Sequence, residues 1–121
     1  MRTSSVTSAR DRSSLARARR VHAPVFAALG DETRLSLVAK LCERSPQSIA
    51  RLTKGSHLTR QAISKHLRVL QNVGIVESVR VGRESRYALR PKPINGIKSY
   101  LEDVSRRWDE ALDRLKTFVE C

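Results

Sequence analysis

The chain of 121 residues suggests a single domain that is long enough to bury a hydrophobic core. Hydrophobic residues make up 40% and charged residues 30%, as is ordinary for a soluble globular protein, and no apolar run approaches the ~18 residues of a membrane span. The formal net charge of +12 is unusual, and it favours a polyanionic partner, foremost nucleic acid.

The positive charge is unevenly distributed along the chain. Residues 1–20 carry six arginines against one aspartate, and residues 54–73 carry four basic side chains and no acidic one. Residues 74–93 hold five basic and two acidic side chains, whereas residues 94–121 hold five and six. The basic excess is therefore localised, as expected of a polyanion-binding surface rather than of a uniformly basic protein.

The first 20 residues are rich in Ser and Arg and show no helical or strand period, so we predict a disordered basic arm before a domain over residues 21–121. A functional arm and an incidental tail both fit this composition. From residue 21 onwards, Pro24 suits the first turn of a helix and Gly30 suits a helix end.

The next predicted element is a core-facing helix over residues 31–43. Asp31 is suited to the N-cap, and Glu32 lies in the favourable first turn. The apolar stripe that should face the core contains Leu35, Val38, Leu41 and Cys42. Two cysteines, Cys42 and Cys121, are too few for a disulfide framework and fit a reducing cytoplasm, with Cys42 as a small core residue.

A helix-turn-helix follows. Ser45-Pro46 breaks the chain, residues 47–54 predict a short helix, and Gly55-Ser56 interrupts it. Thr59 suits the N-cap of a second helix that runs to residue 72 or 73, and Gly74 suits its C′ position.

This second helix has one apolar and one wholly non-acidic face. On a helical wheel Ile63, Leu67 and Leu70 share one side, and His66 lies on that side as a packed histidine. The opposite arc offers only cations, amides and a hydroxyl, as a recognition helix needs in a DNA major groove. A solvated helix that lacks acids by chance is the alternative. The predicted DNA contacts on this helix are Thr59, Arg60, Gln61, Ser64, Lys65 and Arg68.

Residues 75–81 and 85–89 are β-rich runs on either side of Gly82-Arg83-Glu84, which predicts a two-stranded hairpin. Arg80, Arg83 and Arg86 surround its turn, so we predict a wing whose arginines reach phosphates or a minor groove. An ordinary exposed hairpin is the alternative.

The remainder of the chain predicts one long helix with apolar residues spaced alternately by three and four. Such a seam calls for a partner helix, and the same helix of a second subunit is the economical choice. Packing within one subunit is the alternative. The predicted fold is thus mainly α (α+β), a winged helix-turn-helix with a two-stranded wing and a long dimerisation helix. The predicted interface comprises Ile94, Ile97, Leu101, Val104, Trp108, Leu115 and Phe118.

Over about residues 22–121 the chain resembles the ArsR/SmtB family of bacterial winged-helix repressors. The resemblance implies a homodimeric, operator-binding repressor that dimerises through its first and last helices. Metal-sensing members carry Cys-x-Cys where this chain has SPQSIARL, or Asp and His on the last helix, and residues 94–121 contain no His. The resemblance is therefore to a non-metal-sensing branch, without cofactor, and an inducer stays open. It is carried by FAALGDETRLSLVAKL, LTRQAISKHLRVLQNVGIV, VGRESRYAL and SYLEDVSRRWDEALDRLKTFVE.

Three other functions compete with a sequence-specific repressor. One is a thiol- or ligand-responsive regulator of the same fold, one is a basic protein-interaction module that does not read DNA, and one is non-specific packaging of nucleic acid. An enzyme is not expected, because His22, His57 and His66 are scattered and no nucleophile–base pattern or phosphate-binding glycine loop is present.

Overall fold

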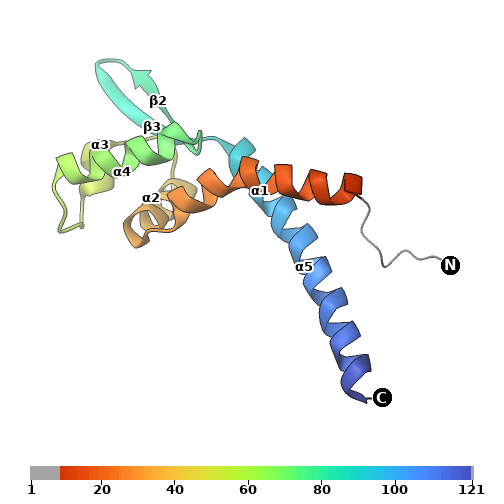
Figure 1. The fold of residues 1–121 in the computed structure, drawn as a ribbon. Helices are drawn as coiled ribbons and strands as arrows, with labels where there is room; N and C mark the ends of the chain where they lie inside the picture. Colours follow the sequence, from red (N-terminus) through yellow and green to blue (C-terminus); the bar gives the residue numbers. More distant parts are fainter. Residues whose placement is uncertain (1–8, 121) are drawn as a thin grey trace.

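The computed structural model describes residues 9–120 of the chain. It confirms the winged helix-turn-helix and the long C-terminal helix (Figure 1). The elements in chain order are α1 (Ala9–Leu29), α2 (Glu32–Glu43), β1 (Gln47–Ser48), α3 (Ile49–Thr53), α4 (Arg60–Asn72), β2 (Val76–Val81), β3 (Glu84–Leu89) and α5 (Pro91–Glu120).

The sheet has three antiparallel strands in the order β1-β3-β2. Strands β2 and β3 form the predicted two-stranded hairpin, and β1 is an additional strand that the sequence analysis did not predict. The third strand pairs Gln47 with Tyr87 and Ser48 with Arg86. A strand of two residues shows no alternation of apolar and polar side chains, which is why the sequence did not reveal it. The Gln47 side chain is buried and donates hydrogen bonds to the carbonyls of Lys40 (2.8 Å) and Arg44 (2.6 Å), so it ties the end of α2 to the sheet.

The core lies between α1, α2, the helix-turn-helix and the base of the hairpin. The predicted helix is confirmed as α2, with Asp31 as its N-cap. The face that α2 turns toward the core, however, differs from the predicted one. Leu37 and Leu41 are its buried residues, whereas Leu35 is 52% exposed and Cys42 is also exposed. The prediction of Cys42 as a core residue is therefore wrong. The face of α2 that packs on the core contains Leu37, which was not part of the predicted stripe. The buried hydrophobic residues of the described chain are Val25, Ala28, Leu37, Leu41, Leu52, Ile63, Leu67, Leu70, Ile75, Val76 and Ile97.

Helix α1 is longer than the sequence suggested. It begins at Ala9, so residues 9–20, which we expected to be disordered, are helical, and residues 1–8 of the predicted arm lie outside the described residues. Ala and Arg are strong helix formers, and Leu15 and Ala18 are half-buried at a helical spacing from His22. Pro24 therefore lies inside the helix rather than at its start, where its missing N–H leaves one backbone carbonyl without a helical donor.

Helix α1 crosses the first part of α5. The ring of Tyr100 lies 5.4 Å from that of His22 and 5.9 Å from that of Phe26, measured between ring centroids. At Gly96 a Cβ atom would approach the His22 ring within 3.2 Å, so the small residue permits the close crossing. Pro91 and Pro93 belong to the first turn of α5, which then extends well beyond the other elements (Figure 1).

Candidate nucleic-acid interface

The second helix of the helix-turn-helix, α4, begins as the sequence predicted. Thr59 is its N-cap, and the hydroxyl oxygen accepts a hydrogen bond from the backbone N–H of Ala62 at 3.1 Å. This satisfies one of the unpaired N–H groups of the first turn and leaves the Thr59 hydroxyl hydrogen free to donate. At the other end Gly74 adopts a φ of +81°, the left-handed conformation that ends the helix before the hairpin.

The two faces of α4 differ as predicted. Ile63, Leu67 and Leu70 are buried against the core and fix the rotation of the helix about its axis. Val69, which the helical wheel places at the edge of the apolar side, is 37% exposed. The predicted contact residues are turned away from the core, with Thr59, Arg60, Gln61, Lys65 and Arg68 exposed and Ser64 half-buried.

A polar cluster connects α4 to the corner between α1 and α2. The Arg34 guanidinium donates through Nε to the carbonyl of Ala28 at 2.6 Å and lies through NH1 3.1 Å from Nδ1 of His66. A guanidinium is only a donor, so this contact is a hydrogen bond in the His66 tautomer whose Nδ1 is free to accept. The same nitrogen lies 3.7 Å from a carboxylate oxygen of Asp31. His66 is thus held by polar contacts as well as by packing.

Asp31 itself is fixed by the first turn of α2. Its carboxylate accepts the backbone N–H of Arg34 at 3.0 Å, and this hydrogen bond is the main cause that holds the pKa of Asp31 below its ordinary value. The positive charges of Arg34 and, when protonated, His66 act in the same direction. The Asp31 carboxylate therefore stays ionised at neutral pH, beside the guanidinium of Arg34.

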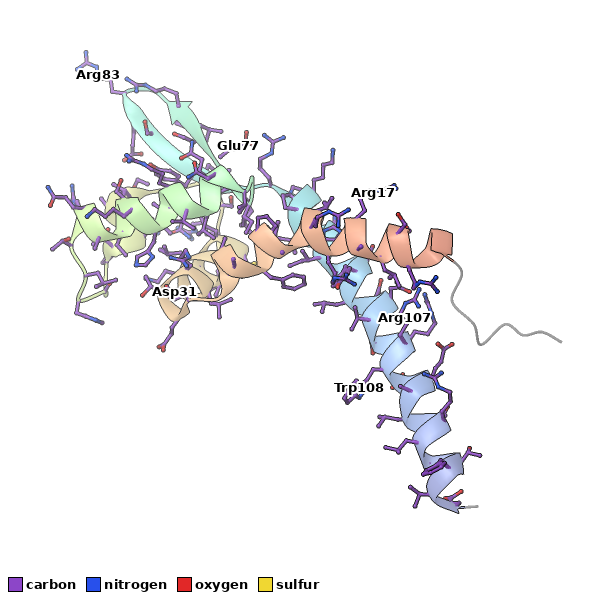
Figure 2. The ribbon with its side chains drawn as sticks, viewed as in Figure 1. Arg17, Asp31, Glu77, Arg83, Arg107 and Trp108 are labelled. Carbon is purple, nitrogen blue, oxygen red and sulfur yellow. The ribbon has the colours of Figure 1, made fainter. Side chains whose placement is uncertain are left out.

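The hairpin separates the arginines that the sequence grouped together. In the β2–β3 register Arg80 lies opposite Ser85, and Val79 lies opposite Arg86, so Arg80 and Arg86 point to opposite faces of the hairpin. Arg83 stands at the tip and points away from the body of the molecule (Figure 2). Arg86 is half-buried and forms an ion pair with Glu84 at 2.7 Å.

The cations of this surface have little internal compensation. The ion pairs of Arg86, Arg90, Arg106 and Arg107 all lie outside α4. The predicted contact cations of α4, together with Arg80 and Arg83, form none within the described part of the chain. An external polyanion can therefore approach them without breaking existing pairs.

Helix α5 divides the predicted interface into two parts. Ile97 is only 7% exposed and belongs to the core of its own subunit, and Ile94 packs against that core. Beyond them the large apolar side chains are open to solvent, and Trp108 is 65% exposed and Phe118 80%. Figure 2 shows Trp108 projecting from the helix. At ~100° per residue the apolar positions of the second part share an arc of about 120°. These positions are Leu101, Val104, Trp108, Ala111, Leu112, Leu115, Phe118 and Val119.

Within residues 9–120 no helix is long and apolar enough to cross a membrane. In the same part of the chain no group of three or more His, Cys, Asp or Glu side chains is placed to hold a metal ion.

Comparison with known proteins identifies the family. Residues 31–78, from the N-cap of α2 into β2, match the model of the arsR family of bacterial regulatory proteins. The uncharacterized HTH-type transcriptional regulator YuzN of Bacillus subtilis is 36% identical over 85 residues, which cover 64% of this chain and 92% of YuzN. The chain belongs to the ArsR family.

Other ArsR-family proteins align with most of the chain. The arsenical resistance operon repressor of Bacillus subtilis is 31% identical over 74 residues, which cover 61% of this chain and 70% of that protein. The solved structure of an ArsR-like transcriptional regulator from Rhodococcus sp. RHA1 is 42% identical, with a TM-score of 0.70 over 82% of this chain and 92% of that one. This ArsR-family chain is therefore a transcriptional regulator with a DNA-binding helix-turn-helix, and its relatives are regulators rather than enzymes.

Sequence reasoning missed two features of this ArsR-family protein. The Arg34–His66 contact joins residues 32 positions apart, and no local pattern marks such a pair. Leu112 and Val119 of α5 were left out because a strict three-four spacing omits them, although the helical wheel places both within the apolar arc.

Proposed function

We propose that the protein is a homodimeric repressor that reads an operator with α4. The observation that supports this most is the exposed face of α4, which presents Arg60, Gln61, Lys65 and Arg68 without an acidic side chain or an ion pair in the described structure. Arginine and lysine suit guanine edges or phosphates, and glutamine can pair bidentately with adenine. A binding surface for another protein would have no reason to exclude carboxylates.

In this proposal the hairpin adds contacts beside the major groove. Arg83 at the tip and Arg80 on one face are exposed and extend past the core. A narrow minor groove attracts arginine because its negative potential is high. Arg86 lies on the other face, so it cannot share the same groove contact as Arg80 and serves another part of the DNA.

We further propose that the exposed arc of α5 forms the dimer interface. It runs from Leu101 to Val119, and its large apolar side chains have nothing to cover them in one subunit. The charged side chains of this part of α5 lie on the remaining arc, as in a helix that pairs with a second helix. A twofold dimer would present two copies of α4 to half-sites about 34–36 Å apart.

Regulation in this proposal does not use a metal site. Residues 45–52 contain no Cys, His, Asp or Glu, residues 94–121 contain no His, and borderline or soft metals need such ligands. Although one relative is an arsenical resistance operon repressor, this chain has only Cys42 and Cys121 as thiols. We infer a cytoplasmic repressor. If an inducer acts on it, that inducer binds without metal coordination.

Fluorescence anisotropy tests the proposal. The wild-type protein is titrated against labelled DNA from upstream of its own gene and against a scrambled duplex, at several salt concentrations. A preference of roughly 10³ or more at physiological salt supports a specific regulator. Equal affinities for duplexes from that region and for scrambled DNA, both lost as salt rises, would contradict a repressor of its own promoter.

A further inference from the structure

A basic groove lies apart from the reading face of α4. It has a volume of about 530 Å³ and is bounded by the end of α2, by β1 and α3, and by β3 of the hairpin. No residue of α4 lines it. Four of its lining side chains are cations and one is acidic, and the cations are Arg44, Arg51, Lys54 and Arg86.

The third strand creates this groove. Because Ser48 of β1 pairs with Arg86 of β3, the start of α3 is held beside the outer face of the hairpin. Arg86 therefore points toward α3 rather than toward the face that carries Arg80. Cations from three separate segments of the sequence meet along one depression only because of this pairing.

The charges in the groove are largely uncompensated. Arg86 has an acidic partner, Glu84, whereas Arg44, Arg51 and Lys54 are exposed and form no ion pair with any side chain of residues 12–120. Four like charges along one groove repel each other, and a bound anion relieves that repulsion. Guanidinium groups match the geometry of phosphate oxygens, and lysine adds a point charge.

The lining also indicates the kind of ligand. Its apolar side chains are only Pro46 and Ala50, so the groove offers no aromatic or large aliphatic surface for a base or an organic effector. Its walls are the helix that precedes α4 and the hairpin that follows α4, the two elements next to the reading face. A phosphate chain that passes the reading face would meet these cations.

We propose that this groove binds phosphates of the DNA backbone, with Arg51 and Lys54 as the principal contacts. The inference rests on the proposed function and adds a second contact surface to it. Such contacts hold the protein on the duplex and carry no sequence information. Their loss lowers affinity for operator and scrambled DNA alike.

The double variant Arg51→Gln/Lys54→Gln tests the groove, and Arg114→Gln/Lys116→Gln on the distal part of α5 is the charge-matched control. Loss of four phosphate contacts per dimer makes the negative slope of log affinity against log salt shallower by about 3.6. Between 50 and 200 mM salt, the affinity of the groove variant should therefore fall ~10²-fold less than that of the wild type. Sedimentation checks that both variants keep the assembly state of the wild type.

A second variant is expected to tighten DNA binding, so loss of folding cannot explain its effect. Glu84→Gln removes the only acidic side chain of the groove and releases Arg86, so we expect several-fold tighter binding to both duplexes at low salt. An unchanged salt slope in the double variant would overturn the inference. The inference would also be overturned if the double variant no longer bound inorganic phosphate, as measured by NMR, while its affinity for DNA stayed unchanged. The groove would then bind a free anion and not the DNA backbone.

The outcome is separable from that of the proposed function. Operator preference of the wild type decides whether the protein reads sequence, whereas the salt slope on scrambled DNA decides whether the groove holds phosphates.

Discussion

Replacement of Trp108 by alanine is the sharpest test of the α5 interface. A tryptophan side chain can bury up to ~250 Å². Because Trp108 is 65% exposed in one subunit, about 150 Å² remains for a partner to cover, or ~4 kcal/mol per subunit at 25 cal/mol per Å². Ordering and imperfect polar pairing at an interface consume part of this free energy. We expect Trp108→Ala to weaken the dimer by at least about 2 kcal/mol, which raises its Kd roughly thirty-fold.

Sedimentation velocity over a concentration series measures this Kd directly. Leu35→Ala is the matched control, since Leu35 is also an exposed apolar side chain on a helix but lies on α2, away from the α5 arc. Thermal unfolding of both variants should stay close to that of the wild type apart from the linkage to dimerisation. An equal Kd for Trp108→Ala and wild type, or an equal shift in the control, would refute the assignment of this arc to the dimer.

Three further predictions concern α4 and its support. Gln61→Ala should relax discrimination at one base position by about 1–3 kcal/mol in anisotropy titrations against single-base operator variants, whereas Gln71→Ala near the end of α4 should not. Leu67→Ala removes a fully buried side chain and should lower the free energy of unfolding by about 2–5 kcal/mol in urea, and a similar loss for the exposed Val69→Ala would contradict the packing. The pKa of Asp31 is lowered in the folded state, so its stabilising contribution is present above the unfolded pKa and fades as pH falls through the folded pKa. Asp31→Asn keeps an N-cap acceptor but does not titrate, so its stability difference from wild type should shrink in acid, and a difference constant with pH would contradict this.

The sequence predicted those features that depend on local chemistry. Thr59, Gly74 and the apolar spacing of α4 each impose a conformation on their neighbours, and the structure has α4 and its faces where these signals placed them. The same holds for the Asp31 N-cap of α2.

The sequence failed where distant segments decide the outcome. Residues 9–20 continue a helix whose His22 and Phe26 pack against Tyr100 of α5. Whether Gln47 and Ser48 form a strand depends on a free edge of β3. The rotation of α2 was wrong for a related reason, because Leu35 and Leu37 are equally apolar and only the tertiary packing selects between them.

The guanidinium of Arg34 has a mechanical consequence. It contacts the last turn of α1 through the carbonyl of Ala28 and the middle of α4 through His66. The Arg34 side chain therefore links α1, which crosses α5, to α4, the helix proposed to enter the DNA major groove. Motion of α1 against α5 must then either tilt α4 or break one of these two contacts. In the proposed dimer, a change in the angle between the two subunits would therefore also change the distance between their α4 helices. A signal that reaches only α1 and α5 can alter DNA binding without approaching the DNA.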